Sequence, residues 1–328
     1  MPQIDDRWSL FSFRAVRVEN RALRIVVLPE LGGRIWSIVY KPHDRELLWQ
    51  NPCIPPERAP LGAAFDDVWC GGWEELFPSG APGIINGEQY PDHGEVWSLA
   101  WDSEIESYED GARLTLRCHT PISRVEVAKT LSLHGDDALL EVKYSLSNLS
   151  AAELPFIFAL HPAFAVNAAC RLDLPPMTVD LDPTYPGTLT GSRSSFKWPC
   201  AERDGGGVDL RTVFPASSRE VFFLYGHDFA EGWFAITDTN DRISWGLAFS
   251  REFLRSCWIF ATYGGWRDYH TLLVEPATAY PQQIEQAIQK GRAPILLPHA
   301  RVETNVSFRV QEGFSQVSGL NPGGMFEE

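Results

Sequence analysis

Apolar and polar residues alternate along most of this chain with a period of two, the pattern typical of half-buried β-strands. The clearest pair of runs, residues 22–28 and 34–40, flanks a glycine-containing turn at 29–33, which predicts two strands joined by a turn. Similar runs predict strands at 112–118, 125–133, 139–146, 156–160, 221–225, 233–237, 243–249, 258–263, 270–274 and 305–310.

One segment has the features of a helix. Pro281 fits its first turn, Ile284, Ala287 and Ile288 form an apolar stripe, and Gly291 stops it. Many short strands with one or two short helices predict an all-β fold, an antiparallel sandwich or barrel, and not a βαβ fold.

Residues 51–101 are rich in proline, glycine and tryptophan and alternate little, so we expect a long, ordered loop region there. No internal repeat or linker interrupts the strand pattern. The sequence therefore predicts one domain over residues 1–328, with a core at about 20–312 and a loosely ordered tail at 313–328.

Composition excludes several partners. The 328 residues carry a net charge of −15, too few cations to neutralise a run of phosphates, so we expect no nucleic acid and no anionic membrane as partner. The N-terminus has no basic start before an apolar run, and no run approaches the roughly 18 apolar residues of a membrane span. Six cysteines without a CxxC pair indicate reduced thiols. A soluble, cytoplasmic protein, monomer or homodimer, is expected.

Two polar residues lie where predicted strands meet a proline. His161 follows an apolar run and precedes Pro162, and Glu275 ends another and precedes Pro276. Because proline interrupts strand ladders, we expect both side chains at a sheet rim, where they could act as an acid and a base. The alternatives are a core-edge histidine and a salt-bridged glutamate.

Weaker candidates lie nearer the N-terminus. His93 before Gly94 would permit a tight bend beside a ligand, or else is an incidental surface histidine. Arg34 could bind a substrate, and Trp73 could stack on one, although solvation and core packing are the commoner fates. The adjacent Glu74 and its neighbour at 75 should point to opposite faces of an extended segment and so form no carboxylate pair.

Common sites of other kinds are missing from the sequence. It contains no GxxxxGK[ST] phosphate loop, no HExxH or paired-cysteine zinc pattern and no GxSxG nucleophile elbow. No metal site is therefore expected.

Taken in order, several segments resemble motifs of the aldose 1-epimerase (galactose mutarotase-like) superfamily. They include a glycine-tryptophan-acid-phenylalanine-proline loop, a His-Gly motif, a His-Pro-aromatic motif and a glutamate-proline segment. The matching residues are 31–38, 46–52, 71–78, 92–97, 160–164 and 274–278. The resemblance spans about residues 20–312.

This resemblance implies a galactose mutarotase-like β-sandwich, or supersandwich, that interconverts the α and β anomers of a free sugar with no cofactor. It assigns Glu275 as the base that deprotonates the anomeric hydroxyl and His161 as the acid that protonates the ring oxygen. It also implies that His93 binds the substrate near the ring oxygen. Arg34, Trp73 and Glu74 are further candidates for substrate binding.

The sequence also departs from the superfamily pattern. The arginine that usually precedes the His-Gly motif is absent, so Arg34 is the candidate replacement, and the sugar-binding aspartate has no clear counterpart. The sugar, whether neutral, phosphorylated or sulfonated, stays open. The alternatives are a non-catalytic carbohydrate-binding protein on the same scaffold and a hydrolase or lyase, which would usually need a second carboxylate.

Overall fold

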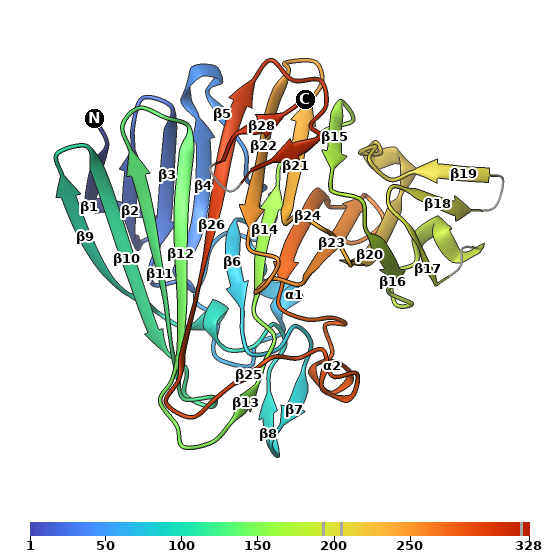
Figure 1. Cartoon of the computed structure of the whole chain (residues 1–328). Coiled ribbons are helices and arrows are strands. Elements are labelled where there is room, and N and C mark those ends of the chain that lie inside the picture. The colour runs from blue at the N-terminus through green and yellow to red at the C-terminus, as the bar shows by residue number, and fades with distance from the viewer. Residues whose placement is uncertain (192–193, 204–205, 322–323) are drawn as a thin grey trace. The chain divides into compact units, whose positions relative to one another are not determined.

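The computed structural model describes residues 1–191, 194–203, 206–321 and 324–328. In these ranges the chain forms antiparallel strands and two short α-helices, which confirms the predicted all-β class (Figure 1). Contacts divide the chain into two compact units, Met1–Pro162 with Ala277–Asn305 and Ala163–Pro276 with Val306–Glu328. The single domain over 1–328 stays a prediction. Neither helix of the described ranges is long and apolar enough to cross a membrane.

The first unit contains one sheet with the strand order β1-β2-β3-β4-β6-β14 and a second with the order β12-β11-β10-β9. Its elements are β1 (Gln3–Leu10), β2 (Phe13–Glu19), β3 (Leu23–Leu28), β4 (Arg34–Tyr40), β5 (Arg45–Glu46), α1 (Phe65–Val68), β6 (Trp73–Leu76), β7 (Gly83–Ile85), β8 (Glu88–Tyr90), β9 (Asp102–Tyr108), β10 (Gly111–His119), β11 (Val125–His134), β12 (Leu139–Asn148), β13 (Leu154–Pro155), β14 (Ala159–Phe164), α2 (Ile284–Gln289) and β25 (Ile295–Leu296).

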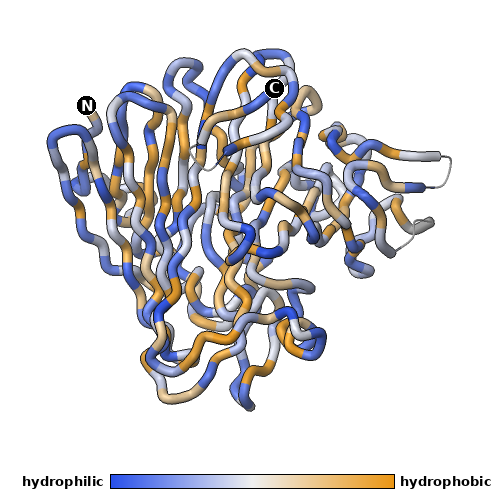
Figure 2. The backbone as a smooth tube through the Cα atoms, in the orientation of Figure 1, coloured by the Kyte–Doolittle hydropathy of each residue, from blue (hydrophilic) through white to orange (hydrophobic). Residues whose placement is uncertain are grey.

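Burial in the first unit follows the sequence pattern. Along β10 and β11 buried residues alternate with more exposed ones, because one face of each strand packs inward. Figure 2 shows hydrophilic and hydrophobic stretches following one another along these strands. In contrast, β4 is buried on both faces, which makes it a core strand.

The second unit contains sheets with the orders β24-β23-β20-β16-β17 and β15-β21-β22-β26. Its elements are β15 (Cys170–Asp173), β16 (Thr178–Leu181), β17 (Ser195–Lys197), β18 (Cys200–Arg203), β19 (Gly206–Asp209), β20 (Glu220–His227), β21 (Trp233–Asp238), β22 (Ile243–Phe249), β23 (Ser256–Tyr263), β24 (His270–Ala277), β26 (Arg301–Glu312), β27 (Gly319–Leu320) and β28 (Phe326–Glu327). The first residues of β26 and the last of β24 belong to the first unit, and the last two residues of β14 belong to the second.

The prolines do not end the two strands that carry His161 and Glu275. Strand β14 continues through Pro162, which pairs with Trp73, and β24 continues through the proline that follows Glu275. A proline removes one backbone donor and can be accommodated where that donor is not needed. The expectation that both side chains mark strand ends is therefore wrong.

Two other segments differ from expectation. The predicted loop region 51–101 contains the fully buried strand β6. In the segment 313–328, expected to be loosely ordered, Val317, Leu320 and Phe326 pack against Trp233 and its neighbours. The described part of this segment is therefore integrated into the second unit, because burying these apolar side chains stabilises it.

Candidate active site

Strand β6 presents two adjacent carboxylates to opposite faces of its sheet. Its pairing with β14 places His161 opposite Glu74. Both Glu74 and Glu75 have no exposed surface, and because side chains alternate along a strand their contacts are separate. The prediction that they form no carboxylate pair is confirmed.

Three donors surround the Glu74 carboxylate. Arg34 Nη1 donates to Oε2 over 2.6 Å, and Trp69 Nε1 donates to Oε1 over 3.0 Å. His161 Nδ1 lies 3.1 Å from the same Oε1. Arg34 also donates to the Gly71 carbonyl oxygen over 2.5 Å, which connects β4 to the turn that precedes β6. These charge-assisted bonds offset the cost of burying a carboxylate.

The electrostatic balance in this cluster favours an ionised Glu74 beside a neutral His161. Burial alone would raise the pKa of Glu74, but the charge of Arg34 and the hydrogen bond with His161 outweigh it and lower the pKa. Burial lowers the pKa of His161, and Glu74 offsets only part of this effect. Because an ionised carboxylate can only accept hydrogen bonds, a hydrogen bond between this pair requires the imidazole proton on Nδ1 and a lone pair on Nε2.

His93 lies next to His161 on a sharply bent backbone. The two imidazole rings have centroids 5.3 Å apart at 89°, and Phe65 stacks on His93 with a centroid distance of 3.7 Å. Gly94 has a φ of 71°, and a Cβ there would lie 2.1 Å from the Phe77 carbonyl oxygen. Glycine is therefore required, as expected for a tight bend at this pair.

The other substrate-binding candidates are enclosed by protein. Trp73 and Glu74 have no exposed surface, and Arg34 is 3% exposed. For Trp73 this burial favours the alternative of core packing. Arg34 Nη1 binds the Glu74 carboxylate and the Gly71 carbonyl oxygen. The Glu74 carboxylate also binds Trp69 and His161.

Glu275 belongs to the second unit. It lies in β24 and is 2% exposed. Burial raises the pKa of the Cys257 thiol on β23, and the Glu275 charge adds to this effect. The structure thus brings Arg34, Glu74, His93 and His161 together within the first unit and places Glu275 in the second.

The partners of Glu75 were not predicted from the sequence. Lys129 Nζ donates to both carboxylate oxygens over 2.9 and 2.7 Å, and the Tyr144 hydroxyl donates to Oε1 over 2.8 Å. The signal was present, since Lys129 falls in phase with the inward-facing Val127 and Leu131 of a half-buried strand. A cationic side chain at an inward-facing position of a strand is buried and so requires a buried anion as its partner.

Phe65 and Trp69 were also missed as neighbours of the histidines. They lie where residues 51–101 show little alternation, so no periodicity indicated which way their side chains point.

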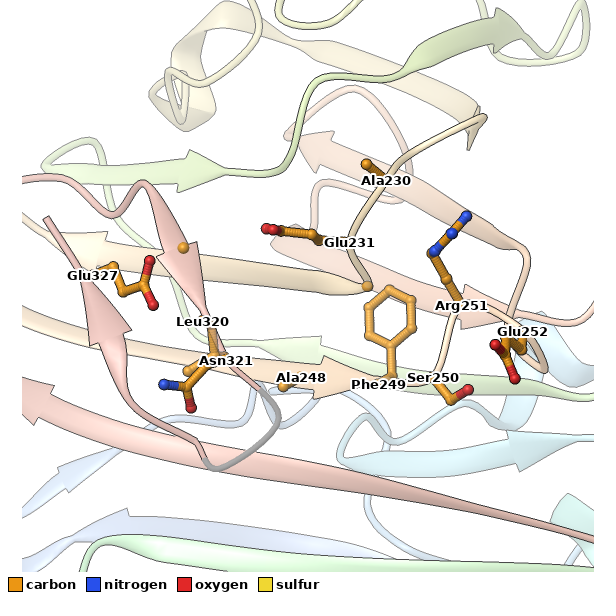
Figure 3. Close-up of a pocket in the computed structure, with 12 residues that line it drawn as sticks. Ala230, Glu231, Ala248, Phe249, Ser250, Arg251, Glu252, Leu320, Asn321 and Glu327 are labelled. Atoms are coloured by element: carbon orange, nitrogen blue, oxygen red, sulfur yellow. The ribbon is translucent and has the colours of Figure 1, made fainter.

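A pocket of about 420 Å³ lies elsewhere, in the second unit. Figure 3 shows Phe249 and Arg251 beside it, with Glu231, Asn321 and Glu327 from other segments. It contains none of the predicted site residues.

No protein-family profile matches the chain. Among solved structures, it is similar to a galactose mutarotase-like protein from Clostridium acetobutylicum, with a TM-score of 0.67 and 14% identity over 95% of this chain and 99% of that one. It is also similar to a galactose mutarotase related enzyme from Lactobacillus acidophilus (TM-score 0.61, 13% identity, 91% and 97% covered). A galactose mutarotase-like protein from Lactobacillus casei gives a TM-score of 0.62 at 17% identity, with 90% and 100% covered. The chain therefore has the galactose mutarotase-like fold, as the sequence motifs predicted.

Proposed function

We propose that this protein is a mutarotase of the aldose 1-epimerase type, which interconverts the α and β anomers of a free sugar without a cofactor. The observation that carries the proposal is the buried Glu74–His161 hydrogen bond beside His93. It leaves one imidazole nitrogen of His161 available for proton exchange. The shared fold supports the proposal, although a fold alone does not determine a function.

The roles follow the sequence resemblance. Glu275 takes the proton of the C1 hydroxyl while protonated His161 gives a proton to the ring oxygen, so that the bond between C1 and the ring oxygen breaks and the open-chain aldehyde forms. Rotation about C1–C2 and ring closure, with both protons returned, yield the other anomer. His93 binds the sugar near the ring oxygen.

The test is anomer exchange at equilibrium, measured by NMR over a panel of neutral, phosphorylated and sulfonated hexoses. Enhanced exchange with one class would identify the substrate. Glu275→Gln and His161→Ala should each lower the exchange rate by roughly 10²- to 10⁴-fold, because each removes one proton-transfer group. Far-ultraviolet circular dichroism would check that both variants remain folded.

If Glu275→Gln retains the wild-type rate, Glu275 is not the base. If His161→Ala retains it, His161 is not the acid. Binding of a sugar without any enhanced exchange would instead indicate a non-catalytic carbohydrate-binding protein, the alternative function on this fold.

A further inference from the structure

Arg34 Nη1 and the Glu74 carboxylate form hydrogen bonds with groups of the protein. The pair is joined over 2.6 Å at 4% and 0% side-chain exposure. The other carboxylate oxygen of Glu74, Oε1, lies 3.1 Å from His161 Nδ1 and accepts a hydrogen bond from the Trp69 indole N–H. In the described part of the chain, the side-chain hydrogen bonds of this carboxylate are all with side chains of the first unit, and the row Arg34–Glu74–His161 crosses three neighbouring strands, β4, β6 and β14.

We propose that Arg34 and Glu74 are a positioning pair that keeps the His161 proton on Nδ1 and makes Nε2 the nitrogen that exchanges a proton with the sugar. Arg34 then does not replace the absent sugar-binding arginine, because its guanidinium forms an ion pair with Glu74. The inference rests on the proposed function for its catalytic meaning.

The geometry explains why a carboxylate is needed here. A histidine that gives a proton from Nε2 must first become an imidazolium, and burial opposes that charge. Glu74 faces the other nitrogen, where its negative charge stabilises the imidazolium and its hydrogen bond fixes the ring. Trp69 and Arg34 in turn fix the carboxylate.

Among the described residues of the first unit, the charged and titratable groups that act on His161 are Glu74 on β6, Arg34 on β4 and His93 before the 3-10 turn at Val96–Ser98. Glu74 raises the pKa of His161, whereas Arg34 and His93 lower it. The two effects have opposite signs because Glu74 and Arg34 carry opposite charges.

The first measurement needs no variant of the pair. In full-length protein labelled with ¹⁵N-histidine, long-range proton–nitrogen correlation spectra at neutral pH report which ring nitrogen of His161 carries the proton, and His161→Gln assigns the signal. The proposal expects the proton on Nδ1. A proton on Nε2 in the neutral ring would overturn it.

The second measurement is the pKa of His161 in variants. Glu74→Gln should lower this pKa by roughly one unit or more, since it removes the nearest anion, and Arg34→Gln should raise it. Glu74→Asp, which keeps the charge, should restore most of the wild-type value. Shifts of the same sign in Glu74→Gln and Arg34→Gln would contradict the proposal.

Glu75→Gln is the matched control. It makes the same change one residue further along β6 but on the opposite face, against Lys129 and Tyr144. It should lower stability and leave the tautomer of His161 unchanged. If it alters the His161 signals as much as Glu74→Gln does, the effect of Glu74 is merely structural.

Kinetics connect the pair to the reaction. In Glu74→Gln, kcat for the sugar identified above should fall at least about tenfold, with a smaller change in KM. As the pH rises, kcat/KM should fall where the His161 imidazolium loses a proton. In Glu74→Gln this fall should occur at a lower pH, in step with the pKa of His161 measured by NMR. An unchanged kcat with an altered KM would indicate that Glu74 binds the sugar and does not position His161.

These outcomes separate the two proposals. If the tautomer and the opposite pKa shifts are found but no sugar shows enhanced exchange, the proposed function fails and the pair has no catalytic role. If exchange is found with His161 protonated on Nε2, the function stands and the positioning pair is wrong.

Discussion

At the scale of single residues, two glutamates adjacent in sequence have opposite electrostatic surroundings. Glu74 faces Arg34 and a histidine, and its pKa is lowered. Burial raises the pKa of Glu75, and the charge of Lys129 offsets only part of the rise. Burial also lowers the pKa of Lys129. Burial thus opposes the charges of both Glu75 and Lys129, and the short, direct contacts between them offset this cost, so either partner left alone would be a costly buried charge.

Lys129→Met tests this ion pair. Removing the cation leaves the Glu75 carboxylate buried with the Tyr144 hydroxyl as its one remaining hydrogen-bond donor among the described residues. The free energy of unfolding, measured by urea denaturation, should fall by about 3–5 kcal/mol. The double variant Glu75→Leu/Lys129→Met should recover much of this loss. A single variant as stable as the wild type would show that the pair contributes nothing to the fold.

At the scale of elements, the short strand β6 organises the site. Its pairing with β14 sets Glu74 against His161, and the bridge between Phe77 and Gly94 joins the end of β6 to the His93 bend. The Glu95 backbone N–H donates to the Phe77 carbonyl oxygen over 2.7 Å. Backbone contacts thus place both histidines relative to a single strand.

Gly94→Ala tests the bend. The added Cβ would meet the Phe77 carbonyl oxygen at a φ of +71°. Gly87→Ala is the control, because Gly87 has a φ of +87° with nothing within 4 Å of the new Cβ. The control should cost about 1 kcal/mol of unfolding free energy from the backbone alone.

Gly94→Ala should cost a further 1–3 kcal/mol or so, because a backbone atom cannot easily move away. Sugar affinity, measured by calorimetry, should fall only in this variant, since it displaces His93. Equal losses of stability in the two variants would mean that the close approach to Phe77 is unimportant.

At the scale of the whole chain, the C-terminal residues belong to the core of the second unit. Phe326 is 6% exposed and packs in a cluster with Trp233, Ala248 and Leu320. A loosely ordered tail would leave these apolar side chains in water, at a cost of about 1.5–3 kcal/mol for each large one.

Phe326→Ala should lower the unfolding free energy by about 3–5 kcal/mol, through lost burial and the cavity that remains. Phe326→Leu, which keeps most of the apolar volume, should cost clearly less. Thermal unfolding followed by fluorescence would report both. No change in either variant would mean that the segment is loosely ordered in solution, as the sequence alone suggested.

Most of the strands could be predicted from the sequence, because alternation is a local pattern imposed by one buried face. The runs at 112–118, 125–133 and 243–249 each fall within an observed strand. The run at 156–160 is the exception, since β14 begins at Ala159 and continues past Pro162. The prediction assumed that every residue of a strand needs its backbone donor.

The sequence by itself determined the all-β class and the opposite orientation of Glu74 and Glu75, and it permitted the tight bend at His93 without requiring it. Each follows from properties of neighbouring residues. Only the tertiary structure decided that Arg34 binds Glu74 and that Glu74 binds His161, residues 40 and 87 positions apart. A buried charge must find a partner, but many charged residues could serve, and only the pairing of distant strands selects one.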